Sequence, residues 1–249
     1  MSGHSKWATI KHKKAATDAK RGRTFTHLIK EITVAARNGG GDPDANPRLR
    51  TAVTAAKASS MPADNIKRAI QRGTGELPGV QYEEVTFEGY GPGGVAILVE
   101  VATDNRNRTV SEIRHIFSKQ GGNLGEAGSV AWMFKKRGYL VVPKEKADEE
   151  TLMSIVLDAG ADDMRDDGSS WEVITPLESF EAVQQALKAS HIDAAVAEVS
   201  LIPANYIKLE GKNAQQMVRL METFEEHDDV QHVYSNFDIE EKELEAVSE

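Results

Sequence analysis

The stretch that decides the fold is EEVTFEGYGPGGVAILVEVATD, residues 83–104. Residues that favour strands, such as Val, Ile, Phe and Thr, lie on both sides of a centre rich in Gly and Pro, which is typical of two strands joined by a turn. GYGPGG (89–94) also has the spacing of a dinucleotide-binding loop, but such a loop leads into a helix whose N-terminus holds the pyrophosphate. Here a second strand follows and Pro92 stiffens the segment. We therefore predict a hairpin turn and no nucleotide site.

Short helices and strands alternate downstream of this hairpin. A helix is expected from about Thr109 to Gln120, and GSVAWMFKKRGYLVVP (128–143) is one long strand or two short ones broken near Lys136–Gly138. The other expected elements are helix 148–159, strand 170–175, helix 178–189, strands 195–202 and 205–209, helix 213–226 and strand 231–237. This mixture is typical of α+β folds of the split β-α-β type, and the number of elements predicts two such units.

Upstream of residue 80 the apolar period is helical. A first helix is expected from about Thr17 to Asn38, and NGGGDP stops it, with Gly39 at the left-handed position after the last turn. A second helix opens at Asn46–Pro47, because Asn is a good N-cap and Pro is favoured at the first helical position. A third is predicted within SSMPADNIKRAIQRG, and GTGELPG (73–79) is expected to be a linker.

These patterns predict three domains. Residues 1–78 form a basic helical domain with a mobile N-terminal arm. Residues 79–136 and 204–240 form a discontinuous α+β domain, because the last strand–helix–strand segment returns to complete the first unit, and residues 137–203 are inserted between them. The expected fold class is α+β multidomain: an N-terminal three-helix domain followed by two ferredoxin-like α+β domains, the last one inserted into the other.

Charge is divided unevenly along the chain. The net charge is -9, yet residues 1–72 carry 15 Lys and Arg against 5 Asp and Glu, whereas residues 73–249 carry 15 against 34. Such asymmetry indicates one part that binds a polyanion and another that is solubilising or binds a partner.

Several classes of function find no support in the sequence. The chain has no Cys and no apolar run long enough to span a membrane, and no apolar segment follows its basic start, so the cytoplasm is the expected location. AGADDMRDDG (159–168) departs from calcium-loop spacing and is expected to be a solvated turn, and His227 and His232 lack the carboxylate spacing of a metal site. No catalytic motif is present. We therefore expect a non-enzyme with no cofactor, metal, membrane partner or small-molecule substrate.

The leading candidate site is the basic arm together with the start of the first helix. Its cations can each neutralise a phosphate and release counterions, and its Trp can stack on a base. The predicted nucleic-acid contacts there are Lys6, Trp7, Lys11, Lys13, Lys14, Lys20, Arg21 and Arg23. A smaller candidate is DNRNRT (104–109), where Arg106 and Arg108 precede the expected helix. A capped loop with two solvated arginines explains those two residues equally well.

Several motifs together resemble the YebC/PmpR family. They are GHSKW (3–7), KRGRTF (20–25), GGGDPDANPRLR (39–50), FEGYGPGG (87–94), DNRNRTVSEIRHIFSKQGGNLG (104–125) and GSVAWMF (128–134). The resemblance runs the whole length, although its specific motifs lie before residue 135. It implies an N-terminal helical domain, two ferredoxin-like α+β domains and a cytoplasmic non-enzyme usually described as a probable DNA-binding transcriptional regulator. Relatives in this family, among them a mitochondrial translational activator of a cytochrome oxidase subunit, act on translation at the ribosome.

These observations favour a non-enzymatic regulator of gene expression that binds nucleic acid through its basic N-terminal domain. No predicted helix has the pattern of Asn, Gln and Arg side chains that contact base edges in the DNA grooves. Binding is therefore expected to be mostly electrostatic. DNA and ribosomal RNA stay open as the target, with a role in transcription or in translation respectively. A further alternative is a protein-interaction module that works through the acidic α+β domains.

Overall fold

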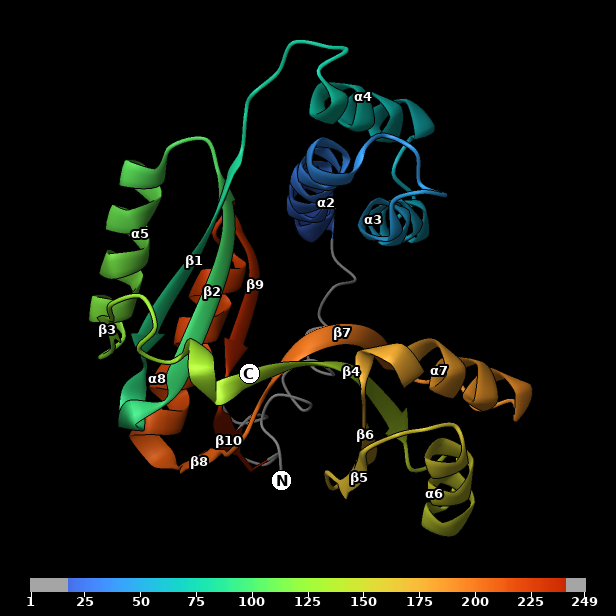
Figure 1. Cartoon of the computed structure of the whole chain (residues 1–249). Coiled ribbons are helices and arrows are strands. Elements are labelled where there is room, and N and C mark those ends of the chain that lie inside the picture. Colours follow the sequence, from blue (N-terminus) through green and yellow to red (C-terminus); the bar gives the residue numbers. More distant parts are fainter. Residues whose placement is uncertain (1–17, 241–249) are drawn as a thin grey trace.

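A computed structural model of the chain describes residues 18–240, with side chains from Gly22 onward. A helical unit is followed by two α+β units, each built on an antiparallel four-stranded sheet (Figure 1). The α+β fold with an N-terminal helical part is confirmed.

The helical unit consists of α2 (Asp18–Gly39), α3 (Pro47–Ala58) and α4 (Ala63–Thr74). Its small core comes from all three helices and consists mainly of Ile32, Ala35, Ala36, Leu49, Ala52, Val53, Ala56, Ile66 and Ala69. As predicted, Asn46 caps α3, and its side chain accepts a hydrogen bond from the backbone nitrogen of Leu49 at 3.1 Å. The left-handed residue after α2 is Gly40, with φ of 86°, and not Gly39, because α2 continues for one residue more than expected.

The first sheet has the strand order β3-β1-β2-β9. Its strands are β1 (Glu83–Tyr90), β2 (Ala96–Thr103), β3 (Asn123–Leu124) and β9 (Val230–Ser235). As predicted, β1 and β2 form a hairpin, and the turn between them contains the short 3-10 helix η1 (Pro92–Gly94). Gly93 and Gly94 there have φ of 71° and 81°, which L side chains rarely adopt.

The two faces of this sheet are covered by different elements. Helices α5 (Arg106–Lys119) and α8 (Gly211–Glu225) pack on one face, where the rings of Phe117 and Phe224 meet edge to face with centroids 4.9 Å apart. The other face contacts α2 at one end, and at the other end it packs against η2 (Ala131–Met133), β4 (Phe134–Pro143) and β7 (Val196–Pro203). This sheet therefore lies at the junction of all three units.

The second sheet has the order β5-β6-β4-β7. Its remaining elements are β5 (Asp163–Asp166), β6 (Ser170–Thr175), α6 (Glu149–Asp158), η3 (Leu177–Ser179) and α7 (Phe180–Ala189). Helices α6 and α7 share a core with β4 and β6. A separate parallel pair is formed by β8 (Ile207–Leu209) and β10 (Phe237–Ile239).

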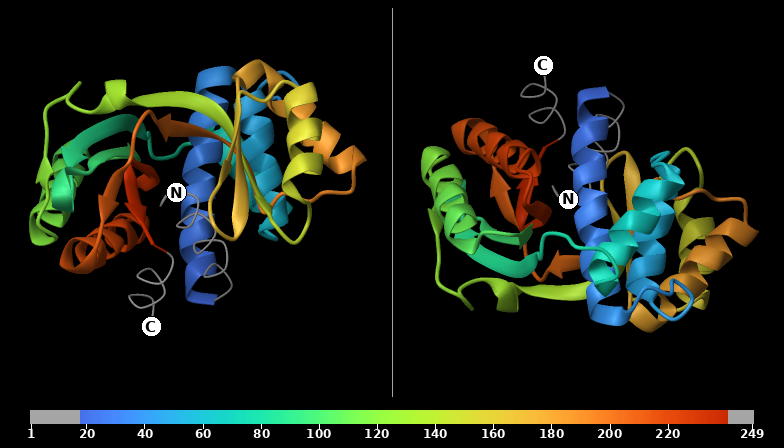
Figure 2. Two further views of the ribbon diagram at one scale, coloured as in Figure 1. Left: turned by 90° about the horizontal axis from the view of Figure 1, so that it is seen from below. Right: turned by 90° about the horizontal axis from the view of Figure 1, so that it is seen from above.

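Helix α2 lies beside the first sheet and contacts β2 and β9, and the helical unit lies above the second α+β unit in the view of Figure 1 and overlaps it in the views from below and above (Figure 2). Residues 83–124 and 230–235 share one sheet, while 134–203 supply the other, so the chain leaves the first sheet and returns to it. The proposed division into 1–78, 79–136 with 204–240, and 137–203 is compatible with this topology and stays a prediction.

Three local predictions were wrong, for the start of α5, for 163–166 and for 231–237, and the structure decides the alternative left open for 128–143. Helix α5 begins at Arg106 and not near Thr109, because the side chain of Asn105 accepts from the backbone nitrogen of Arg108 at 3.1 Å and caps the helix. Residues 163–166 are an edge strand and not a solvated turn, since they pair with β6. The stretch 134–143 is one unbroken strand, and the strand predicted over 231–237 is divided between β9 and β10.

Candidate nucleic-acid interface and the ionic cluster beside it

Most residues of the predicted arm lie outside the described part of the chain. This group comprises Lys6, Trp7, Lys11, Lys13 and Lys14. Lys20 and Arg21 lie in the first turn of α2, but the description of side chains starts after them. The role of all seven in binding nucleic acid stays a prediction.

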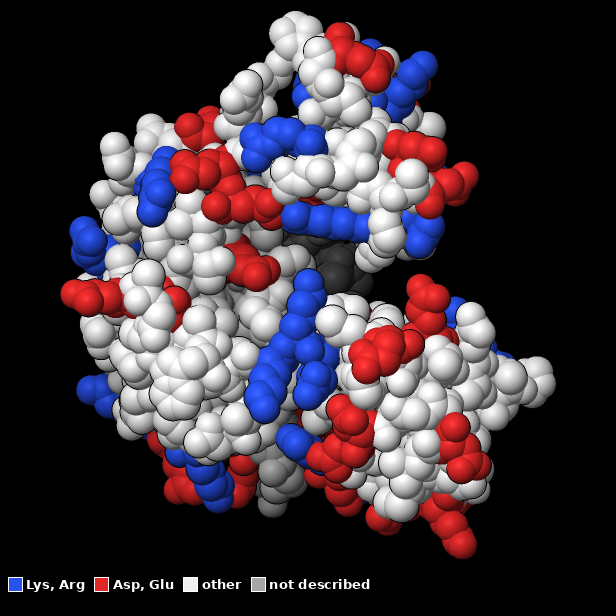
Figure 3. Space-filling view, in the orientation of Figure 1, with Lys and Arg blue, Asp and Glu red and all other residues white. Residues whose placement is uncertain are grey.

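The helical unit has nine described basic side chains between residues 22 and 78, and three of them form ion pairs. Arg23 contacts Glu226 at 3.3 Å, Lys30 contacts Asp229 at 2.6 Å, and Arg48 contacts both Glu31 and Glu84 at 2.7 Å. The other six are exposed and form no ion pair with another described side chain: Arg37, Arg50, Lys57, Lys67, Arg68 and Arg72. Figure 3 shows basic and acidic side chains side by side over the helical unit, and a second basic group below it over β4.

The best-defined polar site lies where α2 meets the first sheet, and its centre is the carboxylate of Asp229, whose side chain is only 5% exposed. One carboxylate oxygen accepts from Lys30 Nζ at 2.6 Å. The other accepts from Arg108 at 2.6 Å, Thr109 at 2.7 Å and Thr103 at 3.1 Å. Asp229 therefore joins the helical unit to β2 and α5.

The ammonium group of Lys30 has a hydrogen-bond acceptor for each of its three donors. Its ammonium group also donates to the backbone oxygens of Asp228 at 2.9 Å and Ala102 at 3.3 Å, and it lies 5.3 Å from the centre of the Tyr82 ring. Burial alone would raise the pKa of Asp229, but the hydrogen bonds from Lys30, Thr109 and Arg108 outweigh it and lower that pKa well below its usual value. The Asp229 carboxylate is therefore charged at neutral pH and accepts its hydrogen bonds.

The two arginines of DNRNRT differ in their surroundings. Arg106 is exposed, and one of its N–H groups meets Glu83 at 3.3 Å, a contact between two exposed side chains. Arg108 donates to the buried Asp229 and also to Asp104 at 3.0 Å. These contacts hold the Arg108 guanidinium inside the protein's own carboxylate cluster. A contact of either residue with nucleic acid stays a prediction, and the structure does not favour it for Arg108.

An open pocket of about 820 Å³ borders this cluster. Five carboxylates line it against two permanent cations, Lys30 and Arg108; they are Asp104, Glu112, Glu226, Asp228 and Asp229. An excess of negative charge repels phosphate, so this pocket is not suited to a polyanion.

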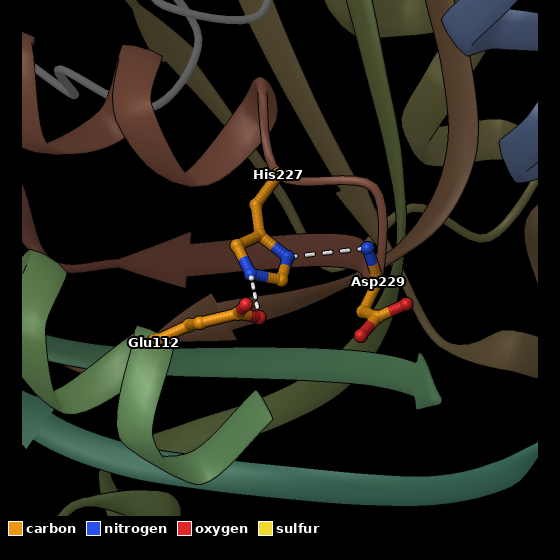
Figure 4. Close-up of side chains that lie close together, drawn as sticks. All are labelled: Glu112, His227 and Asp229. Carbon is orange, nitrogen blue, oxygen red and sulfur yellow. Dashed lines mark hydrogen bonds and ion pairs between the residues drawn. The ribbon is translucent and has the colours of Figure 1, made fainter. Parts of the chain in front are cut away.

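Glu112, His227 and Asp229 lie close enough to contact one metal ion, since their ligand atoms are within 4.8 Å of one another (Figure 4). His227 Nδ1 accepts from the backbone nitrogen of Asp229 at 3.1 Å, which assigns the ring proton to Nε2, 3.0 Å from Glu112. Both oxygens of Asp229 already accept from Lys30 and Arg108. A metal ion bound to either oxygen would have to displace one of these cations from a buried carboxylate, so the cluster fits an ion-pair network better than a metal centre.

The sequence did not point to Lys30 or Asp229, because 199 positions separate them. A signal was nevertheless present in ITVAA, residues 32–36, which is apolar except for Thr33, and the structure buries all five residues. A helix that is buried all round is an internal helix, and a lysine next to such a run needs a counter-charge.

Two family models match the chain. One is described as the TACO1/YebC protein N-terminal domain and covers residues 5–76, and the other is described as the TACO1/YebC second and third domain and covers residues 82–237. Within residues 18–240, no helix combines the length and apolar character needed to cross a membrane.

Similar proteins match over nearly the full length. A protein from Solibacter usitatus is 69% identical over 100% of both chains, and one from Acidobacterium capsulatum is 67% identical over 98% of both. Both are named probable transcriptional regulatory protein. The crystal structure of a conserved hypothetical protein from Aquifex aeolicus superimposes with a TM-score of 0.81 at 45% identity, covering 93% of this chain and 96% of that one.

Proposed function

The chain belongs to the TACO1/YebC family, and from this we propose that it is a regulator of gene expression that binds nucleic acid, in the first place DNA. Its relatives are named for a role in transcription, a process in which DNA is the template. The function proposed here is binding and regulation, without catalysis.

The observation that carries this proposal is the set of exposed cations on the helical unit. Six of its nine described basic side chains are exposed and form no ion pair with a described residue. Helix α4 shows the arrangement best, because it buries Ile66 and Ala69 and leaves Lys67, Arg68 and Arg72 exposed. Exposed cations of this kind neutralise phosphates and release counterions from the polymer.

We propose that these cations act together with the N-terminal arm. The arm contacts are Lys6, Trp7, Lys11, Lys13, Lys14, Lys20 and Arg21. Arg23 and Arg106 form ion pairs only with exposed carboxylates, and such pairs contribute little stability, so both can exchange a carboxylate for a phosphate. Arg108 keeps its bond to Asp229.

The test compares two charge-reversal variants on a promoter-length DNA duplex. One changes Lys11, Lys13 and Lys14 to Glu, and the other changes Lys67, Arg68 and Arg72 to Glu. If six to eight phosphates are contacted, the logarithm of the binding constant falls with the logarithm of salt at a slope of about -5 to -7. Each variant should weaken binding at least tenfold and reduce the magnitude of this slope by about 3.

The matched control changes Lys119, Lys146 and Lys188 to Glu, which alters the total charge equally on exposed side chains outside the helical unit. We expect wild-type affinity and slope for it at physiological salt, where charges beyond about 8 Å are largely screened. Salt-independent binding, or equal losses in all three variants, would contradict phosphate contact by the helical unit.

A second measurement separates DNA from the ribosome as the target. Binding to the duplex and sedimentation with ribosomes are compared at the same salt concentration. Tighter association with ribosomes, lost in the same two variants, would move the proposed function from transcription to translation.

A further inference from the structure

A rigid loop leads into β4 and carries an exposed tryptophan. The loop is held by Glu88, which is 8% exposed and accepts from the backbone nitrogens of Gly128 at 2.5 Å, Val130 at 2.7 Å and Ala131 at 2.8 Å. Burial alone would raise the pKa of Glu88, but these three backbone bonds lower it, so the carboxylate is charged and keeps its acceptors at neutral pH. The loop is therefore fixed from within the protein.

Trp132 follows this loop and is 72% exposed, more than any other large hydrophobic residue in the described part of the chain. Its neighbours Val130 and Phe134 are buried, and its indole nitrogen donates to the backbone oxygen of Ser129 at 3.1 Å. A backbone anchored on both sides thus presents a large and mostly exposed aromatic ring to solvent.

The residues after Trp132 add positive charge. Lys135 and Lys136 are exposed and form no ion pair with a described side chain. Neighbouring residues of a strand point to opposite faces, so Lys135 and Lys136 lie on the two sides of β4. Lys135 comes three positions after Trp132 along the chain, so their Cα atoms lie within about 11 Å of each other. Their cross-strand partners on β7, Ile202 and Leu201, are uncharged.

The surroundings keep this charge available. No Asp or Glu occurs between residues 127 and 144, although the chain as a whole is acidic. Strand β6 pairs with β4 only from Gly138 onward, so the first part of β4 has a neighbour on one edge only. Figure 3 shows the basic group over β4 next to an uncharged surface over the turn that leads into it.

We propose that Trp132, Lys135 and Lys136 form a second nucleic-acid contact that takes an unpaired, single-stranded segment. The ring stacks on a base and the lysines contact the adjoining phosphates, a combination that tolerates any sequence because every base has a π face. This contact rests on the proposed function and adds to it: the helical unit supplies the general phosphate contacts, and this surface selects single strands over duplex.

The experiment uses tryptophan fluorescence in the full-length Trp7→Phe variant, which keeps Trp132 and the buried Trp171. A short single-stranded oligonucleotide of mixed sequence, tested as DNA and as RNA, should quench the emission in a saturable way. The additional change Trp132→Phe should abolish this signal. The duplex of the same sequence should quench less, because its bases are already stacked on one another.

Affinity supplies the second readout. Trp132→Ala should weaken binding of the single strand about tenfold or more, as expected for the loss of one stacked base, and Trp132→Tyr should retain most of it. Lys135→Glu with Lys136→Glu should weaken binding as well. The controls are Leu177→Ala, an exposed apolar residue elsewhere, and Lys146→Glu with Lys188→Glu, and both should bind as the wild type does.

The outcomes separate the two proposals. Wild-type affinity in Trp132→Ala, together with losses in the helical-unit variants, would overturn this second contact and leave the proposed function in place. Unchanged Trp132 emission at saturation, or equal quenching by the duplex, would also overturn it. If the wild type binds no nucleic acid of either kind, the proposed function fails and this contact fails with it.

Discussion

The carboxylate of Asp229 accepts from four side chains that belong to the helical unit, β2 and α5. Asp229→Asn keeps the shape of this group but removes its charge, which leaves the buried ammonium of Lys30 without a counter-ion. Breaking one partner of a buried ion pair costs about 3–5 kcal/mol. Because Lys30 keeps two backbone oxygens, we expect the free energy of unfolding at pH 7 to fall by about 3 kcal/mol, as measured by urea denaturation.

The same variant predicts a pH dependence. An Asp side chain titrates near 3.9 in the unfolded chain. In the folded protein, burial alone would raise the pKa of Asp229, but the hydrogen bonds from Lys30, Thr109 and Arg108 outweigh burial and lower this pKa. Its contribution to stability is therefore complete above about pH 4 and is lost as pH falls toward the folded pKa. The difference between wild type and Asp229→Asn should narrow below pH 4. A constant difference down to about pH 2 would contradict this account, and Glu226→Ala, which breaks an exposed pair, should show a much smaller change.

At the scale of elements, two asparagines cap helices in different surroundings. Asn46 is buried, caps α3 and donates to the backbone oxygens of Ala35 at 2.8 Å and Gly40 at 2.9 Å, whereas Asn105 caps α5 and is exposed. Loss of a cap costs about 1 kcal/mol, and a buried carbonyl left unpaired adds about 1–3 kcal/mol. We expect Asn46→Ala to lower the free energy of unfolding by about 2–4 kcal/mol and Asn105→Ala by about 1 kcal/mol.

Changes to aspartate distinguish the cap from the donor role. Asp caps a helix as well as Asn does but cannot donate. Asn105→Asp should therefore be nearly neutral, and Asn46→Asp should destabilise strongly, because a carboxylate would face two carbonyl oxygens. Equal melting temperatures of the two aspartate variants would refute a donor role for Asn46.

These elements also show what a sequence can predict. The cap at Asn46 and the hairpin turn at 89–94 were predicted because the interacting partners lie within a few residues. Strand β5 was missed because its Asp residues interrupt the alternation of apolar and polar residues that is typical of a strand. These residues form a strand because they pair with β6. The Lys30–Asp229 pair was missed for the same reason, since its partners meet only after the chain returns to the first sheet. A local sequence pattern predicts helices and strands, whereas contacts between residues far apart in the sequence are known only from the structure.

Over the whole molecule, part of the charge asymmetry is used inside the protein. The acidic part supplies Glu84, Glu226 and Asp229, which bind cations of the helical unit and hold it on the first sheet. The sequence alone suggested that the positive charge of the first domain meets an external polymer. The structure divides this charge, because three described basic residues form ion pairs within the protein, whereas six are exposed and form none with a described side chain.

This division predicts how the molecule responds to salt. At about 1 M salt the Debye length is about 3 Å, so the exposed Arg48–Glu84 pair is screened while the buried Lys30–Asp229 pair is screened much less. We expect the radius of gyration of the wild type, measured by small-angle X-ray scattering, to be equal at physiological and 1 M salt. Lys30→Met should expand with salt and be cleaved faster by protease within the exposed segment 75–82.

The matched control is Arg48→Met, which removes an exposed pair and should leave the radius unchanged at both salt concentrations. Expansion of the wild type at high salt would show that the buried pair does not hold the helical unit in place. The effect of salt on the domain arrangement matters for the proposed function. The slope of binding against salt gives the number of phosphate contacts only if the domain arrangement itself does not change with salt. The buried Lys30–Asp229 pair at the junction provides that independence, since it is screened much less by salt than the exposed charges proposed to bind the ligand.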